Sequence, residues 1–286
     1  MKTTLNIIAT SCLVIWLWSC EEVTVIDIKN SETYLVVDGG VFLTPTADGK
    51  QFIRLSETVP FFDEDNRKPV TSATVAVSDG TATVVFDHVS DGRYEGVLVP
   101  AAGETYTLTV AYNGRTYQAT GVMPGLVLAE NLQLVYTDLT NDPFADGNKI
   151  GYVASIDMQD PAGIKNYYLY KLLVNGQSTF LADPGNRLNT VVEDQYFDGK
   201  FLSSVEVNND WLSQPGDEVE VQLFNISREQ YEFYYALFTL TAGNSLLGDP
   251  PPAPIQGNVV SVNDPTERVL GFFQVAARSS VSGTVE

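Results

Sequence analysis

Apolar residues recur at every second position through much of the chain, which is the period of a half-buried β-strand. The clearest example covers residues 105–112, and its apolar members are Tyr106, Leu108, Val110 and Tyr112. Asn113-Gly114 follows directly. This dipeptide is a strong hairpin signal, because both central positions of the favoured two-residue turn need positive φ. The pattern predicts a strand over 105–112 that pairs with a strand over 116–120.

Similar short strands fill the rest of the chain. Residues 51–55 and 73–77 alternate, and Asp79-Gly80 predicts a turn before a strand over 82–86. Short strands with turns every 8–12 residues favour an immunoglobulin-like or transthyretin-like β-sandwich over 34–124. Further alternating segments follow, so we expect a mainly β protein with a β-rich C-terminal domain over 125–286.

One segment in the second half breaks the β pattern. Ser227 and Gln230 form a capping box, in which each side chain is expected to satisfy an unpaired amide of the first turn. Tyr231, Tyr234, Tyr235 and Phe238 then share one face at helical spacing. The spacing predicts one α-helix over about 227–242.

The N-terminus reads as a targeting segment. Lys2 precedes an apolar run over 13–18, and Leu17-Trp18-Ser19-Cys20 resembles a lipobox. We therefore expect 1–19 to be a lipoprotein signal peptide and 20–33 a tether lipidated at Cys20. The run is shorter than the roughly 20 apolar residues that a bilayer requires, and it suits a secretory signal better. Plain secretion and a membrane-spanning anchor remain as alternatives.

The net charge limits the binding partners that we expect, and the cysteine content limits the thiol chemistry. The net charge is −20 at pH 7, and binding to nucleic acid depends on Lys and Arg contacts to phosphate. We therefore expect no nucleic-acid partner, and contact with lipid only through an acyl anchor. The only two cysteines are Cys12 and Cys20, so the mature protein should contain neither a disulfide nor a reactive thiol.

Several sequence blocks carry a family resemblance. They are Tyr34–Gly39, Ile53–Thr58, Pro60–Phe62, Val70–Val75, Asp91–Tyr94, Gly103–Leu108, Gln256–Val259 and Val269–Phe273. In this order, and after the lipobox, the chain resembles the Bacteroidota outer-membrane lipoproteins of the family named domain of unknown function 4249 (DUF4249).

The resemblance implies a location and a partner. Members are typically encoded beside TonB-dependent transporters of the SusC type, and no catalytic residues are assigned to the family. Glu21 and Glu22 directly follow Cys20 and resemble the surface-export signal of such lipoproteins, although a solvated linker would look the same. The resemblance thus predicts a lipid-anchored outer-membrane protein that faces the cell exterior.

Candidate catalytic groups are sparse. His88 is the only histidine, and its position beside a turn favours a surface residue over a catalytic base. No G-x-S-x-G motif is present, and a zinc site would lack both cysteine and further histidine. Carboxylate pairs such as Glu193-Asp194 could in principle hydrolyse glycosides, but acidic residues are too numerous for such pairs to be informative. We expect a protein that is not an enzyme.

One oxygen-rich loop and a few aromatic residues are the remaining candidates. Asp142, Asp146 and Asn148 offer oxygens to calcium, but without EF-hand spacing, so a solvated loop is the default and no cofactor is expected. Phe61, Phe62 and Trp211 are candidates for a partner or ligand surface, although core packing explains most aromatic residues equally well.

The function expected from these observations is that of a non-enzymatic accessory protein. It would bind a SusC-type TonB-dependent transporter, and a nutrient ligand, at the outer surface of the outer membrane. The alternative is a free-standing adhesin or carbohydrate-binding module, and a hydrolase ranks third.

Overall fold

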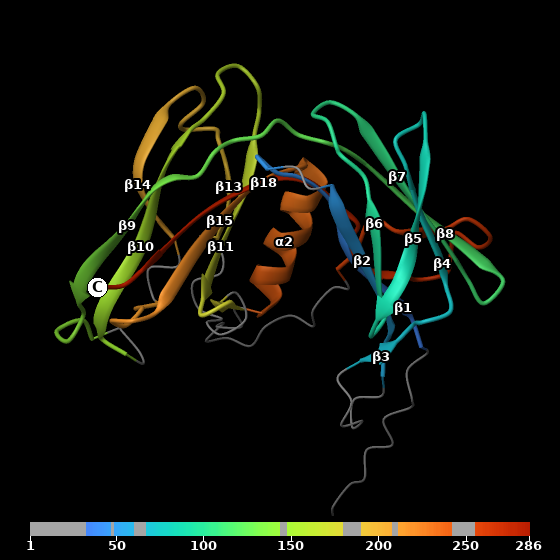
Figure 1. The fold of residues 1–286 in the computed structure, drawn as a ribbon, viewed down its shortest axis with the longest axis horizontal. Coiled ribbons are helices and arrows are strands. Elements are labelled where there is room, and N and C mark those ends of the chain that lie inside the picture. Colours follow the sequence, from blue (N-terminus) through green and yellow to red (C-terminus); the bar gives the residue numbers. More distant parts are fainter. Residues whose placement is uncertain are drawn as a thin grey trace, which may run out of the picture. The chain divides into compact units, whose positions relative to one another are not determined.

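Strands make up most of the regular structure, which confirms the mainly β prediction. The computed structural model describes residues 33–46, 49–59, 67–143, 148–179, 190–207, 211–241 and 255–286. The expected signal peptide and nearly all of the expected tether lie outside this part of the chain. Figure 1 shows the arrangement of the elements described below.

The first half forms a sandwich-like arrangement of strands. These are β1 (Leu35–Leu43), β2 (Lys50–Glu57), β3 (Lys68–Pro69), β4 (Thr74–Ser78), β5 (Thr83–Ser90), β6 (Arg93–Val97), β7 (Thr105–Tyr112) and β8 (Arg115–Val122). β5 joins the two layers, because its start pairs with β4 and its end pairs with β6. Between the layers lies a core that includes Val37, Ile53, Leu55, Leu108 and Val110, all fully buried.

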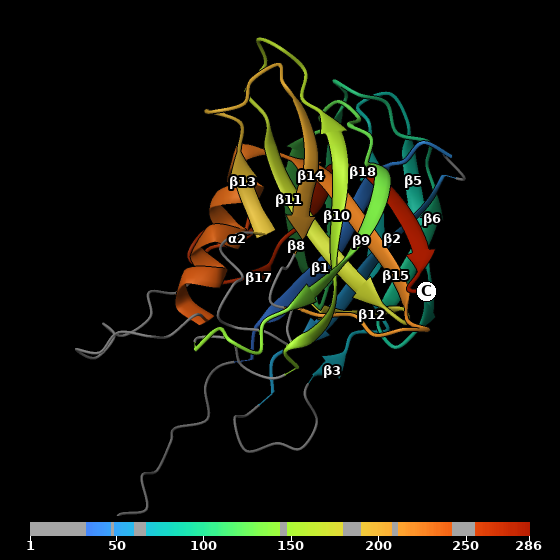
Figure 2. The ribbon, with the colours of Figure 1, turned by 90° about the vertical axis from the view of Figure 1, so that its left-hand side faces the viewer.

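The second half adds a further sheet and extends the first. Its strands are β9 (Glu130–Asp138), β10 (Ile150–Gln159), β11 (Tyr167–Val174), β12 (Gln177–Ser178), β13 (Val191–Glu193), β14 (Phe201–Val207), β15 (Glu218–Ile226), β16 (Val260–Ser261), β17 (Leu270–Gly271) and β18 (Gln274–Thr284). β14, β10 and β9 form a separate three-stranded sheet. Apolar side chains of β10 pack against those of β11 and β15 in a second core, and Figure 2 shows these layers.

The last strand joins the two halves into one sheet. Residues Gln274–Ala277 of β18 pair in parallel with Gly40–Leu43 of β1. Residues Ala277–Thr284 of the same strand pair antiparallel with β15. The sheet therefore runs without a break from β12 through β18 and β1 to β16. The N-terminal core also includes Val259, Val269, Phe273 and Val275, so the end of the chain completes it. The domain boundary at residue 124 stays a prediction.

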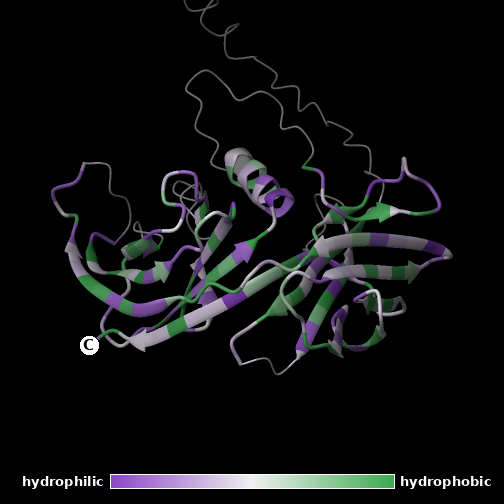
Figure 3. Ribbon diagram, turned by 90° about the horizontal axis from the view of Figure 1, so that it is seen from above, coloured by the Kyte–Doolittle hydropathy of each residue, from purple (hydrophilic) through white to green (hydrophobic). Residues whose placement is uncertain are grey.

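The predicted turns and strand faces are confirmed. Asn113 and Gly114 have φ of 51° and 74°, as the β7–β8 hairpin requires. Asn175 and Gly176 repeat this geometry between β11 and β12, with φ of 52° and 75°. The alternation of buried and exposed residues along the strands appears in Figure 3 as alternating bands of hydropathy.

The predicted helix is confirmed as α2 (Arg228–Thr241). Ser227 Oγ accepts a hydrogen bond from the amide of Gln230 at 3.1 Å, which caps the first turn. The other half of the expected capping box was wrong: the Gln230 side chain is fully buried and donates to Gln274 Oε1 at 3.3 Å. The helix therefore uses Gln230 to contact the start of β18.

The expected aromatic face of α2 needs one correction. Tyr234 and Phe238 are buried in a third apolar cluster with Leu169, Phe224 and Ala276, and Tyr231 packs against that cluster. Tyr235 is 48% exposed, because successive residues of a helix lie about 100° apart and Tyr235 turns away from the sheet. The side of α2 that faces away from the sheet is consequently only partly covered by other described residues.

Glycine permits the closest approach between the two halves. A Cβ atom at Gly40 would lie 1.8 Å from the carbonyl oxygen of Gln274, across the β1–β18 pairing. Such a separation is far inside van der Waals contact, so any side chain here would force the two strands apart. Gly125 has an ordinary φ and would place its Cβ in open space.

We predict that Gly40→Ala lowers the free energy of unfolding by about 3 kcal/mol, in the range of overpacking and broken pairing. Gly125→Ala should leave it within about 0.5 kcal/mol of wild type. Urea denaturation followed by circular dichroism measures both. Equal stability of the two variants would contradict the tight β1–β18 contact.

A carboxylate ties the two layers of the first half together. Glu57 on β2 accepts hydrogen bonds from Lys68 Nζ at 2.8 Å and from the Tyr112 hydroxyl on β7 at 2.9 Å. The bond from Lys68, supported by that from Tyr112, lowers the pKa of Glu57 below its ordinary value of 4.5. Burial and the bond to Glu57 raise the pKa of Tyr112.

This pKa shift predicts a pH-dependent contribution to stability. Because the folded pKa of Glu57 is depressed, its contribution is complete above the unfolded pKa and is lost as pH falls through the folded value. Glu57→Gln should cost about 1 kcal/mol at pH 7, the usual scale for such hydrogen bonds, and much less near pH 3. Urea titrations at both pH values test this, with Glu104→Gln as the exposed control. A cost for Glu57→Gln that does not change with pH would be inconsistent with the assignment.

Candidate functional site

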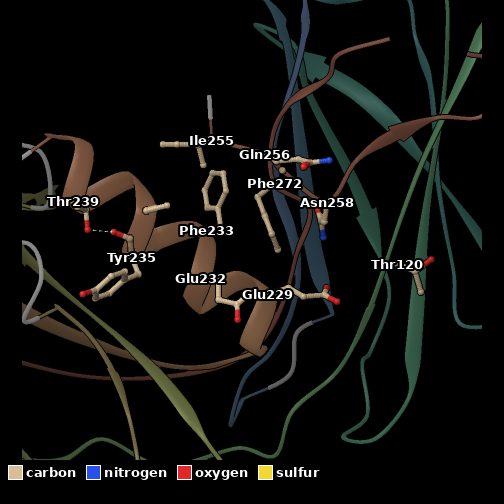
Figure 4. A pocket seen from close by; sticks show the side chains of 12 residues that line it. Thr120, Glu229, Glu232, Phe233, Tyr235, Thr239, Ile255, Gln256, Asn258 and Phe272 are labelled. Atoms are coloured by element: carbon tan, nitrogen blue, oxygen red, sulfur yellow. Dashed lines mark hydrogen bonds between the residues drawn. The ribbon is translucent and has the colours of Figure 1, made fainter. Parts of the chain in front are cut away.

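The half-covered side of α2 forms one wall of a groove of about 770 Å³. The opposite wall is residues 255–258 together with Phe272, and Thr120 of β8 lies at the far side (Figure 4). Volumes of 300–1,000 Å³ are typical of sites for small ligands. We call this feature the α2 groove.

Aromatic side chains form the apolar part of the groove. The rings of Phe233 and Phe272 lie with their centroids 5.0 Å apart, and both line the groove. Ala236 and Ile255 extend the same apolar surface. Tyr235 lies farther along the helix and stacks on Tyr231 at 5.9 Å. The result is a surface on which an apolar or planar group can lie.

The wall opposite the helix is fixed by backbone contacts. The Asn258 side chain donates to the Phe273 carbonyl at 2.9 Å and accepts from the Phe273 amide at 2.8 Å. A Cβ atom at Gly257 would lie 1.8 Å from the carbonyl oxygen of Gly271, so only glycine fits there. These contacts hold the 255–258 segment beside the residues that lead into β18.

Acidic residues border one part of the groove. Glu229 and Glu232 lie on the exposed side of the first turns of α2 (Figure 4). Arg228 Nε donates to Glu232 at 2.8 Å, which partly neutralises that carboxylate. The arrangement suits an apolar ligand or side chain, and a cationic group would be favoured near Glu229.

The site residues expected from sequence are scattered. Cys20, Phe61, Phe62 and Asp146 lie outside the described residues. Trp211 is half-buried and packs against the second core, which leaves only part of its ring for a partner. The roles proposed for these residues stay predictions.

The expected calcium loop is only partly described. Asp142 and Asn148 are both exposed, and the chain between them includes Asp146. In the described part of the chain, Asp160, Asp194 and Asp198 form a different carboxylate group, whose oxygens lie within 4.8 Å of one another. Sequence reasoning missed this group because its members come from segments far apart in the chain.

The carboxylates of this group already have partners within the protein. Tyr168 donates to Asp160 at 2.5 Å, and the Gly199 amide donates to its other oxygen at 2.7 Å. The amide of Asn166 donates to Asp194 at 2.6 Å, and that of Gly163 donates to Asp198 at 2.7 Å. Burial, together with the bond to Asp160, strongly raises the pKa of Tyr168. The three carboxylates therefore connect loops through hydrogen bonds. Their oxygens could also bind a cation.

The single histidine has no catalytic partner among the described residues. His88 is an exposed residue of β5, and its ring lies 5.2 Å from that of Tyr94. No carboxylate or hydroxyl hydrogen bond orients its ring in this part of the structure.

A sandwich-like β protein with an apolar groove beside its single described helix is the class that the fold and site define. A family model for the domain of unknown function DUF4249 matches residues 21–282. The chain belongs to this family. A search of curated proteins returns no match. Among the described residues, no helix has the length and apolar character needed to cross a membrane.

The groove coincides with two of the blocks that carried the family resemblance. Gln256–Val259 and Val269–Phe273 contribute Gln256, Gly257, Asn258 and Phe272 to its lining. The sequence therefore contained a signal for the groove. The signal could not be read as a site, because these blocks look like ordinary strand and turn segments.

We predict that the α2 groove binds a neutral apolar probe, Nile red, and that Ala236→Trp reduces this binding at least tenfold by filling the groove. Ala111→Trp, which places the same ring on an exposed face of β7, should bind as the parent does. Fluorescence titration of the chain from Glu21 onward, which lacks both the apolar signal and the lipidation site and needs no detergent, measures both. Equal binding by the two variants would show that the probe binds elsewhere.

Proposed function

We propose that this protein is a non-enzymatic lipoprotein on the outer surface of the outer membrane, where it binds a SusC-type TonB-dependent transporter and assists nutrient uptake. The lipobox ending at Cys20 and the acidic pair Glu21-Glu22 support the location. Lipidation would attach more than one acyl chain, which is sufficient for stable anchoring. Membership of the DUF4249 family supports the association with a transporter through the resemblance described above.

The observation that carries the binding role is the α2 groove. It is large enough for a small ligand or a partner side chain, and its aromatic lining offers apolar contact area. Its walls are held by the Asn258–Phe273 hydrogen bonds and by the packing of α2 on the sheet. Such a preformed surface binds a partner with little ordering cost.

The charge of the chain is consistent with a role at an exposed surface. A net charge of −20 keeps the protein soluble and repels an anionic lipid surface. Contact with the membrane would then come from the acyl anchor and from the transporter. The same charge would favour a transporter face rich in Lys and Arg.

The alternative function is that of a free-standing adhesin or carbohydrate-binding module. Tyr235 favours it, because an exposed tyrosine stacked on Tyr231 offers a flat face suited to a sugar ring. A module of this kind would bind its ligand without a transporter, so the two functions differ in what is recovered from the membrane.

We predict that the C-terminally tagged protein, cross-linked in cells and purified from outer membranes in mild detergent, recovers a TonB-dependent transporter in near-equal amount. Replacing residues 1–20 by a secretory signal peptide that is cleaved without lipidation should release the protein from the membrane fraction and abolish that recovery. Ala236→Trp should reduce recovery if the transporter occupies the α2 groove, with Ala111→Trp as its control. Mass spectrometry identifies the recovered proteins.

Recovery of the lipoprotein without a transporter, after cross-linking, would contradict the accessory role and favour the free-standing module. Retention of this unlipidated protein in the membrane fraction would contradict the acyl anchor. The two results are separate, because anchoring and transporter binding use different parts of the chain.

A further inference from the structure

A second cavity lies on the opposite side of the β1–β18 junction from the N-terminal core. Strand alternation places Phe42 of β1, Phe52 of β2 and Arg278 of β18 on the same face of the sheet, because Phe42 pairs with Ala276 and Gly40 pairs with Phe52. Together with Lys50 and Ser280 they line a cavity of about 310 Å³, which we call the Arg278 cleft. It shares no lining residue with the α2 groove.

Cations line up along this face on a row of phenyl rings. Phe224, Phe42 and Phe52 lie in sequence across the sheet, with ring centroids 6.1 and 6.2 Å apart. Lys171 lies 5.0 Å from the Phe224 ring, Arg278 lies 5.6 Å from the Phe42 ring, and Arg93 lies 4.0 Å from the Phe52 ring. Cation–π contacts stabilise each position, yet they also gather like charges on a protein whose net charge is −20.

The countercharge on this face is incomplete. Arg93 pairs with Glu95 at 2.5 Å, and Asp38 lies on the same face beside Arg54 in the strand register. Arg278 forms no ion pair with any carboxylate in the described part of the chain. Burial lowers the pKa of Lys171, Asp38 opposes that effect, and the positive charge of Arg278 lowers it further. The two cations thus repel each other across the sheet.

The orientation of Arg278 leaves it suited to an anion. A guanidinium in contact with an aromatic ring presents its N–H donors at its edges, and those donors match the two oxygens of a carboxylate. Hydroxyl groups of Thr44, Thr46 and Ser280 line the same cavity and can donate further hydrogen bonds. The long-range repulsion of the acidic surface is screened beyond about 8 Å at physiological salt, so the local cations dominate within the cleft.

We propose that the Arg278 cleft binds a small organic carboxylate, whose carboxylate group pairs with Arg278 and whose apolar part lies against Phe42 and Phe52. Inorganic phosphate would satisfy Arg278 but would leave both rings uncovered. An uncharged molecule of the same shape would cover the rings and leave the Arg278 charge without a partner. The cleft therefore selects molecules that combine one anionic group with an apolar body.

Isothermal titration of the full chain in mild detergent tests the site with three probes, which are benzoate, benzyl alcohol and inorganic phosphate. Benzoate should bind saturably, and at least tenfold more tightly than either of the other two. Arg278→Gln should weaken benzoate binding at least tenfold, while Arg278→Lys should restore part of it.

The matched control is Arg268→Gln. Arg268 is exposed and lies 5.6 Å from the Tyr34 ring, so it makes the same kind of cation–π contact away from the cleft. Its variant should bind benzoate as wild type does. Three results would each overturn the proposal: no benzoate binding by the wild-type chain, equal binding of benzoate and benzyl alcohol, or equal losses in the Arg278 and Arg268 variants. Phosphate binding as tight as that of benzoate would refute the apolar contact with Phe42 and Phe52.

Discussion

The parallel pairing of β1 with β18 is the constraint on which the other features depend. These strands come from opposite ends of the folded chain, and each is also paired on its other side, β1 with β2 and β18 with β15. The pairing requires a glycine at position 40, because the backbones approach too closely for any side chain. Through it the N-terminal core acquires Phe273 and Val275, so the first half does not bury its apolar surface without the second.

Both proposed binding sites follow from this junction. Residues 255–258 and Phe272 line the α2 groove beside the start of β18, and Gln230 of α2 contacts Gln274 at the start of that strand. The Arg278 cleft is built on the same strand, where Phe42 of β1 meets Phe52 of β2. Both sites thus lie beside the pairing that holds the two halves together.

Local patterns were sufficient to predict much of the fold. The alternation around Leu108 and the Asn113-Gly114 turn predicted the β7–β8 hairpin, and Ser227 together with the aromatic spacing predicted α2. Long-range features were not predictable in this way. Nothing in the local sequence of β18 indicates that it pairs with β1, and Asp160 and Asp194 come together only through the tertiary fold. Gln230 departs from its capping role because a buried partner, Gln274, outweighs the local amide.

The same contrast between local and long-range features applies to the α2 groove and the Arg278 cleft. Phe233 and Phe272 were not recognisable as neighbours, because α2 and the segment between β17 and β18 that carries Phe272 are distant in sequence. Arg278 could not be distinguished from other arginines until the register placed it over Phe42. Sequence motifs predict a membrane anchor at Cys20, because that signal is local, whereas the two cavities required the sheet register.

Native-state hydrogen exchange in increasing urea tests the central claim most directly. If the β1–β18 pairing makes the two halves one cooperative unit, the amides of Leu108 in the first core and Leu169 beside α2 should share one unfolding free energy and one dependence on urea. Loss of protection at Leu108 at a lower urea concentration than at Leu169, while the amides of β18 stay protected, would contradict it.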